Sequence, residues 1–394
     1  MGGHVFATDG LQIPRISSEL YNQLKKEYAN ALAPLYRRTA YAEVLPDKPD
    51  HGDIDILVEG PHASNTPGRV AEALRADKFK CNGSVTNYAV PHPTIPGVHV
   101  QLDVQTSPDG YLEWQTFQNS YGDLSQIIGV INRPLGLTAT DRGLYVRIPE
   151  IEPTNKKASM IHLTHDALAV LSFLGLDTAR YSDRGFTGEG DVFAWVAAAR
   201  FFNRYAVVPR DHEKRPENEN HNDRARRAKR GMYRRFVDDW VPANPEAGAN
   251  CAWTRELVLE EALKTFDKQV EYDARLAEHK ELWREDALWR AIKEKVPRKG
   301  DSLALVIRGL KRWVSSEGGE LVLHAEPLPQ EKKVWVEGLE EGGEEKVLKW
   351  VEEHWTEVQV KEKAWATVKK TQGLASSAVT VQEEKEVKKT RLDH

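Results

Sequence analysis

Two runs of the chain alternate between apolar and polar residues, and each carries aspartate on its polar side. In HGDIDILVEG, residues 51–60, Asp53 and Asp55 lie on either side of Ile54. Successive side chains of a strand point to opposite faces of the sheet, so the two carboxylates share one face. Aspartate is depleted from strands, and a buried carboxylate without a partner is costly. The run predicts a strand with one packed face and one face that presents two carboxylates.

The run GVHVQLDVQT, residues 97–106, repeats this pattern around Asp103. If the two strands are neighbours with matched polar faces, three carboxylates converge on one spot. Such carboxylates repel one another unless they are protonated or neutralised by a cation, and Mg²⁺ or Mn²⁺ prefers oxygen ligands. The pattern therefore predicts a divalent metal site at Asp53, Asp55 and Asp103, of the kind that suits phosphoryl transfer. The alternative is a set of exposed carboxylates on a half-solvated sheet.

The composition describes a highly charged chain with a modest core-forming content. Its 394 residues include 40% hydrophobic and 29% charged residues, with a net charge of -5. The length is sufficient for two or more domains. Two cysteines, Cys81 and Cys251, cannot form a disulfide framework, and no apolar run is long enough to span a membrane. We expect an intracellular protein, cytoplasmic or nuclear, that is not a membrane protein; the composition sets no oligomeric state.

The order of the sequence patterns indicates an α+β protein. Helical spacing over residues 17–36 precedes the aspartate-bearing strands, and residues 111–136 look helical with a break near Gly122. Apolar spacing is then mainly helical, and residues 332–365 have a strand, helix, strand pattern. We predict four regions. They are a mixed sheet with flanking helices over residues 1–150, a helical domain over 151–315, a small acidic α/β segment over 316–374 and a disordered polar tail over 375–394.

The segments GDIDILV and VQLDVQ together resemble the palm of the nucleotidyltransferase superfamily. The resemblance is greatest to the family X DNA polymerases, the group of DNA polymerase β. Downstream, NSYGDLSQIIGVINRPLGLTATDRGLYVRI resembles that family's Tyr-Phe-x-Gly-Ser helix, its following helix and the next strand. The resemblance covers about residues 20–150. It implies that Asp53, Asp55 and Asp103 are catalytic metal ligands, and that Tyr121 and Gly122 lie near the sugar and base of a nucleotide.

One motif of the resembled family is missing from this chain. There, a Gly-Ser pair at a helix start, upstream of the Asp-x-Asp strand, holds the nucleotide phosphates through backbone N–H groups. The equivalent stretch here, RRTAYAEVLPDKPD, has Tyr41 and Ala42 at those positions. The cations nearest in sequence are Arg37, Arg38 and Lys48, which we therefore predict as the nucleotide-binding cations.

A basic run, RARRAKRGMYRR, occupies residues 224–235. It predicts contact with the phosphates of DNA or RNA, through Arg226, Arg227 and Arg230 in particular. The alternative is a solvated helix start that balances the nearby Asp238 and Asp239.

Two functions follow from these observations. The first is a metal-dependent nucleotidyltransferase that moves a nucleoside monophosphate from a nucleoside triphosphate to a hydroxyl, for example a nucleic-acid end. Its cofactor would be Mg²⁺ or Mn²⁺. The second is a catalytically inactive binding or scaffolding protein built on the same fold. Three patterned aspartates favour the first, and the missing Gly-Ser pair favours the second.

Overall fold

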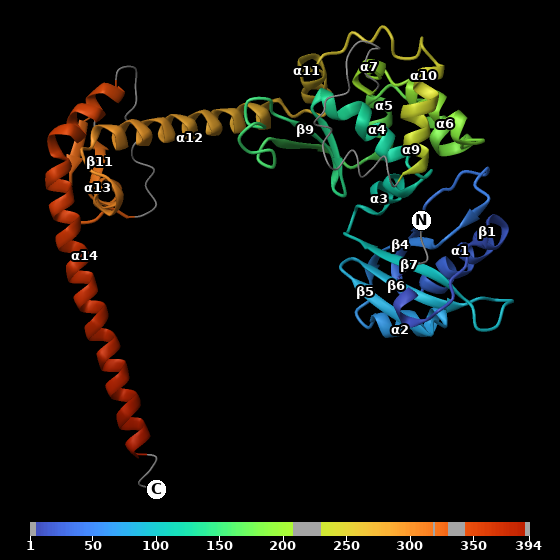
Figure 1. The fold of residues 1–394 in the computed structure, drawn as a ribbon, viewed down its shortest axis with the longest axis horizontal. Helices are drawn as coiled ribbons and strands as arrows, with labels where there is room; N and C mark the ends of the chain where they lie inside the picture. Colours follow the sequence, from blue (N-terminus) through green and yellow to red (C-terminus); the bar gives the residue numbers. More distant parts are fainter. Residues whose placement is uncertain (1–4, 208–229, 318–319, 330–342, 391–394) are drawn as a thin grey trace. The chain divides into compact units, whose positions relative to one another are not determined.

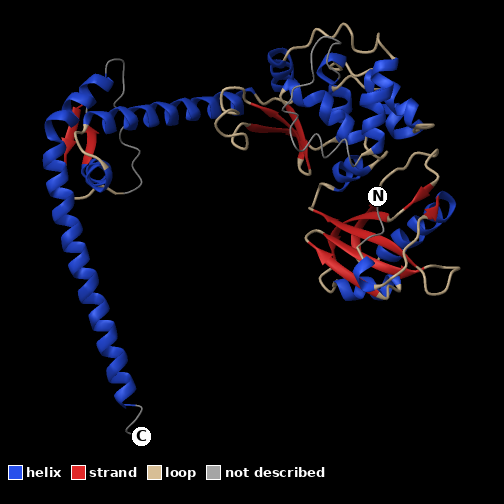
Figure 2. Ribbon diagram, in the orientation of Figure 1, coloured by secondary structure: helices blue, strands red, loops and turns tan. Residues whose placement is uncertain are grey.

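The computed structural model describes residues 5–207, 230–317, 320–329 and 343–390, with side chains through residue 369. Helices and strands are both abundant, so the chain belongs to the predicted α+β class (Figures 1 and 2). The chain divides into two compact units, Met1–Asp273 and Ala274–His394. The domain boundaries predicted at 150 and 315 stay predictions. Within the first unit, α4 (Leu124–Asn132) packs against the later helices α6 (Glu189–Ala197) and α9 (Gly231–Arg235).

A five-stranded mixed sheet forms the N-terminal part of the first unit. Its strand order is β2-β4-β7-β6-β5. Strands β4 and β7 are parallel, and the other three neighbouring pairs are antiparallel. The strands are Tyr36–Tyr41 (β2), Ile54–Pro61 (β4), Lys78–Asn82 (β5), Val85–Pro91 (β6) and His99–Ser107 (β7).

Helices α1 (Ser18–Leu32) and α2 (Pro67–Leu74) cover the apolar face of this sheet (Figure 1). The side chain of Ser17 accepts the Leu20 N–H and so caps α1, as the serine at the start of the predicted helix suggests. The helix ends at Leu32, four residues before the predicted end, and β2 follows almost at once. The core between helices and sheet consists of aliphatic and tyrosine side chains, among them Tyr21, Leu24, Tyr28, Leu32, Ile54, Ile56, Val58, Val70, Leu102 and Val104.

The sheet's other face is partly covered by α3 (Leu112–Asn119), which packs against β2 and β4. The predicted break near Gly122 is confirmed, because Tyr121 and Gly122 both have positive φ, 55° and 66°, between α3 and α4. A separate antiparallel sheet follows, in the order β10-β9-β8. Its strands are Leu137–Thr140 (β8), Gly143–Arg147 (β9) and Met160–Thr164 (β10), while β1 (Ile16–Ser17) pairs with β3 (Asp50–His51).

The rest of the first unit is helical, as predicted. In addition to α6 and α9 it contains short helices and irregular turns around a core of aromatic residues that includes Phe193, Phe201, Phe236 and Trp240. The further helices are Ala167–Phe173 (α5), Arg204–Val207 (α7), Val241–Ala243 (α10) and Arg255–Thr265 (α11), with 3₁₀-helices at Ala7–Asp9 and Arg133–Leu135 and π-helices at Arg180–Arg184 and Phe236–Trp240.

The described residues of the second unit form helices and a hairpin. Helix α12 (Gln269–Lys295) crosses the boundary between the units, and α13 (Gly300–Trp313), β11 (Val314–Glu317), β12 (Glu320–Leu323) and α14 (Gly343–Thr390) follow it. Apolar side chains of α12, α13 and α14 share one core. Glu362 is buried there, where it accepts hydrogen bonds from Arg312 Nε at 3.0 Å and Trp313 Nε1 at 2.9 Å.

Two expectations for the C-terminal region differ from the structure. The strand predicted at the end of residues 332–365 is part of α14, since Val358, Glu362 and Trp365 recur at helical spacing and pack toward α13. The first predicted strand of that segment lies outside the described residues. The same helix continues to residue 390, through most of the predicted disordered tail. The lysine and glutamate of this tail are good helix formers, so a polar composition did not distinguish helix from disorder.

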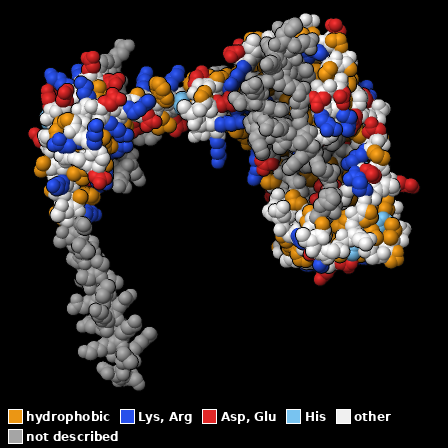
Figure 3. All heavy atoms as spheres, in the orientation of Figure 1, with side chains coloured by type: hydrophobic (Ala, Val, Ile, Leu, Met, Phe, Trp, Pro, Cys, Tyr) orange, Lys and Arg blue, Asp and Glu red, His pale blue; other side chains and the backbone are white. Residues whose placement is uncertain are grey.

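Within the described ranges, every helix is too short or too polar to cross a membrane. On the face of the second unit visible in Figure 3, basic and acidic side chains are interspersed.

Candidate metal-binding site on strands β4 and β7

The three aspartates lie where two parallel strands meet. Asp55 on β4 is directly opposite Asp103 on β7 in the register of the sheet, and Asp53 immediately precedes β4. Neighbouring strands are about 4.8 Å apart, and paired residues point to the same face. The prediction that the two aspartate-bearing runs form adjacent strands with matched polar faces is confirmed. Their role as catalytic metal ligands stays a prediction.

Asp103 is held by two amide side chains on the same face. Asn87, its register partner on β6, donates from Nδ2 to Asp103 Oδ1 at 2.7 Å, and Gln101 donates from Nε2 to the same oxygen at 3.0 Å. Both amides are buried. Burial raises the pKa of Asp103 above its ordinary value, Asp53 adds to the shift, and the two amide hydrogen bonds oppose it.

The pKa of Asp55 is shifted further than that of Asp103. Desolvation by the surrounding protein, then the charges of Asp53 and Asp103, raise the pKa of Asp55 to about 7, and Lys48 opposes the shift. The residue keeps an exposed surface, so its desolvation is incomplete, but both neighbouring carboxylates act in the same direction. The nearby phenol of Tyr21 responds similarly, because burial and the charges of Asp55 and Asp53 raise its pKa. The site therefore has an excess of negative charge.

This charge excess fits a divalent cation, and the carboxylate oxygens are the ligands that Mg²⁺ or Mn²⁺ takes. Among the residues that the structure describes, however, no group of three or more His, Cys, Asp or Glu side chains is arranged so that it could hold a metal ion. The hydrogen bonds from Asn87 and Gln101 fix the Asp103 carboxylate in its present orientation. Binding of a metal by all three aspartates would therefore require side-chain rotation.

A cavity of about 550 Å³ in the first unit brings two of the predicted nucleotide-binding residues together. Lys48 and Gly122 both line it. Lys48 also lowers the pKa of Asp55, but the lining of the cavity does not include Asp53, Asp55 or Asp103. The other lining residues come from the loop after β2, from the residue before α4, from the start of α6 and from α9, and are Val44, Leu45, Asp47, Pro49, Asp123, Glu189, Gly231, Met232 and Arg235.

Tyr121 lies beside this cavity but belongs to the aromatic core. Its buried ring contacts Tyr181 and Phe186 edge to face, with centroid distances of 5.6 Å and 4.8 Å. Its backbone N–H donates to the Glu43 carbonyl at 2.7 Å. Tyr121 thus fastens the loop after β2 to the helical part, and its proximity to a nucleotide stays a prediction.

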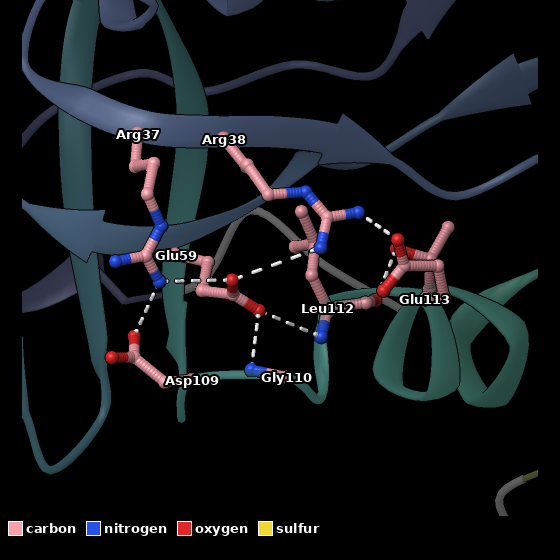
Figure 4. A network of polar contacts seen from close by, with 8 residues as sticks. Arg37, Arg38, Glu59, Asp109, Gly110, Leu112 and Glu113 are labelled. Carbon is pink, nitrogen blue, oxygen red and sulfur yellow. Dashed lines mark hydrogen bonds and ion pairs between the residues drawn. The ribbon is translucent and has the colours of Figure 1, made fainter. Parts of the chain in front are cut away.

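Arg37 and Arg38 take part in a network of ion pairs at the other end of β4 (Figure 4). Arg37 contacts Glu59 at 3.1 Å and Asp109 at 2.8 Å, while Arg38 contacts Glu113 and, at 3.7 Å, Glu59. The buried Glu59 carboxylate also accepts the backbone N–H groups of Gly110 and Leu112, at the start of α3.

The network places both arginines away from the aspartates. Arg38 is the register partner of Glu59, which is four residues, or about 13 Å, beyond Asp55 along β4. Their charges are compensated by carboxylates that join β2, β4 and α3. Nucleotide binding by Arg37 and Arg38 stays a prediction, but their position favours a structural role.

The segment that follows β2 differs from a phosphate-binding helix start. Tyr41 is the last residue of β2, Ala42 is buried, and residues 42–49 form a loop with a turn at 46–47. In this loop the Asp47 carboxylate accepts the backbone N–H of Glu189 at 3.1 Å, at the first turn of α6. The loop is therefore fixed by contacts with the helical part.

Only part of the basic run can be located. Arg226 and Arg227 lie outside the described residues. Arg230 forms an ion pair with Asp123 at 3.1 Å, and Arg235 contacts Glu189 through its Nε at 2.7 Å. These two arginines join α9 to Asp123 and Glu189, which line the cavity, and not to the Asp238 and Asp239 that the alternative named. Nucleic-acid binding by the run stays a prediction.

Three polar residues near the aspartates were missed by the sequence reasoning. Asn87 and Gln101 support Asp103, and their alternation with apolar residues placed them on the same sheet face. Lys25 is a buried lysine on α1. Its spacing from Tyr21 and Leu24 sets it on the apolar stripe of that helix, which is an unusual position for a lysine.

No family model matches the chain, and no curated protein matches it.

Proposed function

We propose that this protein is a metal-dependent nucleotidyltransferase whose catalytic residues are Asp53, Asp55 and Asp103. The reaction would move a nucleoside monophosphate from a nucleoside triphosphate to a hydroxyl acceptor and release pyrophosphate. The proposal adopts a nucleotidyltransferase-type palm for the five-stranded sheet. Its acceptor could be the end of a nucleic acid, a protein or a small molecule.

One observation carries this proposal. Asp55 and Asp103 are register partners on adjacent parallel strands, beside Asp53, and the mutual repulsion of these groups contributes to the raised pKa of Asp55. Clustered charge of one sign lowers the stability of a fold, so its presence needs a reason beyond packing. A site that binds a cation supplies that reason.

The chain's own residues have distinct tasks in this reaction. A bound Mg²⁺ or Mn²⁺ would neutralise phosphate charge. Asp53 and Asp55 would bind the ion, while Asp103 would accept the proton of the attacking hydroxyl. Asn87 and Gln101 hold the Asp103 carboxylate through Oδ1, and Gln101 Nε2 also donates to Oδ2 at 3.3 Å. The cavity beside Lys48 and Gly122 offers room for the nucleoside part of the substrate.

A non-catalytic binding protein is the second candidate, and the loop after β2 favours it. Residues 42–49 have no helix start at the position where phosphates would be bound by backbone N–H groups, and Arg37 and Arg38 are compensated by carboxylates. A displacement of reacting atoms by about 1 Å can lower a rate by on the order of 10²-fold. An enzyme with this loop is expected to be slow.

The test is transfer of label from nucleoside triphosphates in the presence of Mg²⁺ or Mn²⁺. The purified full-length chain is incubated with α-labelled triphosphates and with DNA, RNA and protein acceptors. Activity that is lost in Asp53→Asn supports the enzyme. The matched control is Asp141→Asn, which removes an exposed carboxylate from the turn between β8 and β9.

Activity that survives in Asp53→Asn would show a contaminating enzyme or another site. No incorporation, together with no change in melting temperature on addition of nucleotide and Mg²⁺, would refute the enzyme and leave the binding protein.

A further inference from the structure

The cavity of about 550 Å³ lies within the first unit, and part of its lining is apolar. Its volume is in the range of sites that bind small molecules. Leu45 and Met232 are buried lining residues, and Val44 and Pro49 add two more apolar side chains. Because the lining does not include the three aspartates, a ligand of this cavity does not need to contact them.

The walls of the cavity are held by hydrogen bonds between the loop after β2 and the helical part. Asp47 accepts the backbone N–H of Glu189 at 3.1 Å, and the carbonyl of Glu43 accepts the N–H of Tyr121 at 2.7 Å. The backbone N–H of Glu43 in turn donates to the hydroxyl of Ser120 at 3.0 Å. The loop is therefore fixed before a ligand enters, and little loss of conformational entropy opposes binding.

The apolar part of the lining suits a flat ring system. Met232 and Gly122 both line the cavity, and a Cβ at Gly122 would lie 3.2 Å from the sulfur of Met232. The glycine therefore leaves this sulfur without a covering side chain at that position. Thioether sulfur makes favourable contacts with aromatic rings, and the side chains of Val44 and Pro49 offer further apolar surface.

Most charged side chains of the lining are compensated by the protein itself. Arg235 donates from Nε to the Glu189 carboxylate at 2.7 Å. Asp123 forms an ion pair with Arg230 at 3.1 Å and accepts the backbone N–H of Tyr233 at 3.2 Å. A ligand gains little from these groups, because each would have to release a partner first.

Lys48 is the exception. Among the residues that the structure describes, its ammonium group forms no hydrogen bond and no ion pair, although its backbone carbonyl accepts the Ser18 hydroxyl. The side chain of Lys48 is exposed and lines the cavity. It can therefore bind an anionic group while the rest of the same molecule lies against the apolar lining.

We propose that this cavity binds a small molecule with a flat, largely apolar ring system and a single anionic group, and that Lys48 binds the anionic group. The inference goes beyond the proposed function and does not rest on the three aspartates. A single anionic group is specified because Lys48 is the only uncompensated cation among the described lining residues. A nucleoside monophosphate and an aromatic carboxylate or sulfonate share this chemistry.

The test measures two matched pairs of ligands on the wild type, Lys48→Met and Lys26→Met, all as the full-length chain. One pair is naphthalenesulfonate and naphthalenesulfonamide, the other is AMP and adenosine, and only one member of each pair is charged at neutral pH. Lys26 is an exposed lysine of α1 outside the lining, so its replacement changes the net charge equally. Binding is measured by titration calorimetry without metal at low and high salt, and thermal unfolding shows that each variant is folded.

We expect the wild type to bind the anionic member of at least one pair about 3- to 10-fold more tightly than the neutral member, between the effects of an exposed ion pair and of a hydrogen bond to a charged group. Lys48→Met should lose this preference and keep its affinity for the neutral member, while Lys26→Met should resemble the wild type. High salt should reduce the preference of the wild type, because it screens an exposed charge. The pair whose anionic member binds more tightly identifies the source of the ligand.

A second variant, Val44→Trp, tests the apolar part of the cavity. Added bulk at this lining position should abolish binding of both members of the pair that the wild type binds. Binding that is unchanged in folded Val44→Trp would overturn the inference, and so would a preference for the anion that persists in Lys48→Met or is lost equally in Lys26→Met. Absence of binding of all four ligands to the wild type would overturn it as well. If Val44→Trp does not fold, the comparison of the two lysine variants decides.

Discussion

Replacing Asp55 by asparagine is expected to stabilise the metal-free protein at alkaline pH. Asparagine has nearly the same shape as aspartate but removes one charge from the cluster with Asp53 and Asp103. The wild-type group has a pKa of about 7 instead of 3.8. In a fully buried group, a shift of this size corresponds to about 4 kcal/mol of unfavourable interaction in the ionised form. Asp55 is exposed, so screening by solvent reduces our expectation to about 1–2 kcal/mol.

The sign follows from the raised pKa. Between pH 4 and 7 the folded state binds more protons at Asp55 than the unfolded state does, so the free energy of unfolding decreases as pH rises. The penalty is complete above pH 7 and disappears as pH falls toward the unfolded pKa. Asp55→Asn should therefore exceed the wild type in stability at pH 8 and lose this advantage near pH 4.

Urea unfolding in the presence of EDTA, at several pH values between 4 and 8, measures this difference. Asp141→Asn is the control, and its stability relative to the wild type should change little over the range. Addition of Mg²⁺ at pH 8 should stabilise the wild type and not Asp55→Asn. A variant that is less stable than the wild type at pH 8, or a stability difference that is independent of pH, would refute the argument from charge repulsion. Equal stabilisation of both proteins by Mg²⁺ would place the ion elsewhere.

Three other changes test the remaining contacts. Glu59→Gln should lower the free energy of unfolding by about 2–4 kcal/mol in urea titrations, because the lost buried carboxylate accepts three hydrogen bonds and forms an ion pair with Arg38. The exposed Asp109→Asn should cost at most about 0.5 kcal/mol. Gly143→Ala should cost about 2–4 kcal/mol in the same assay, since its Cβ would lie 2.4 Å from the Thr164 carbonyl oxygen at a φ of +127°; a smaller loss would contradict the backbone geometry. If the basic run binds DNA or RNA, the affinity should fall steeply as the salt concentration rises. Replacing Arg226, Arg227 and Arg230 by alanine should make this dependence on salt weaker. Tight binding that is unchanged in the triple variant would exclude the run as the contact.

The alternation of residues determined much of the sheet. Asp55 and Asp103 lie on the polar face of their strands because strand side chains alternate, whereas Asp53 precedes β4 and alternation does not fix its face. Helix α1 with its serine cap and the break at Gly122 also follow from local sequence, because capping and positive φ depend on a few neighbouring residues. Such features can be predicted from sequence because their causes are local.

Electrostatic environment, in contrast, was decided by residues far apart in the chain. Arg37 and Arg38 are near the aspartates in sequence, but β2 runs antiparallel to β4 and carries them to Glu59 at the other end of the strand. Residues that are close in sequence can therefore lie at opposite ends of neighbouring antiparallel strands. The sequence alone thus predicted nucleotide binding by two arginines whose charges are compensated by carboxylates in the fold.

Lys25, in contrast, is a buried cation that the sequence did not single out. Its sequence position indicates only a lysine on a helix, and most such lysines extend into solvent. Packing of α1 against the sheet buries it between Tyr21 and Tyr41 instead, 4.7 Å from the nearer ring centroid. The sequence determined which side chains share a face of a strand or helix, because that depends on backbone periodicity. Only the tertiary structure decided which charges are compensated, because compensation depends on which elements pack together.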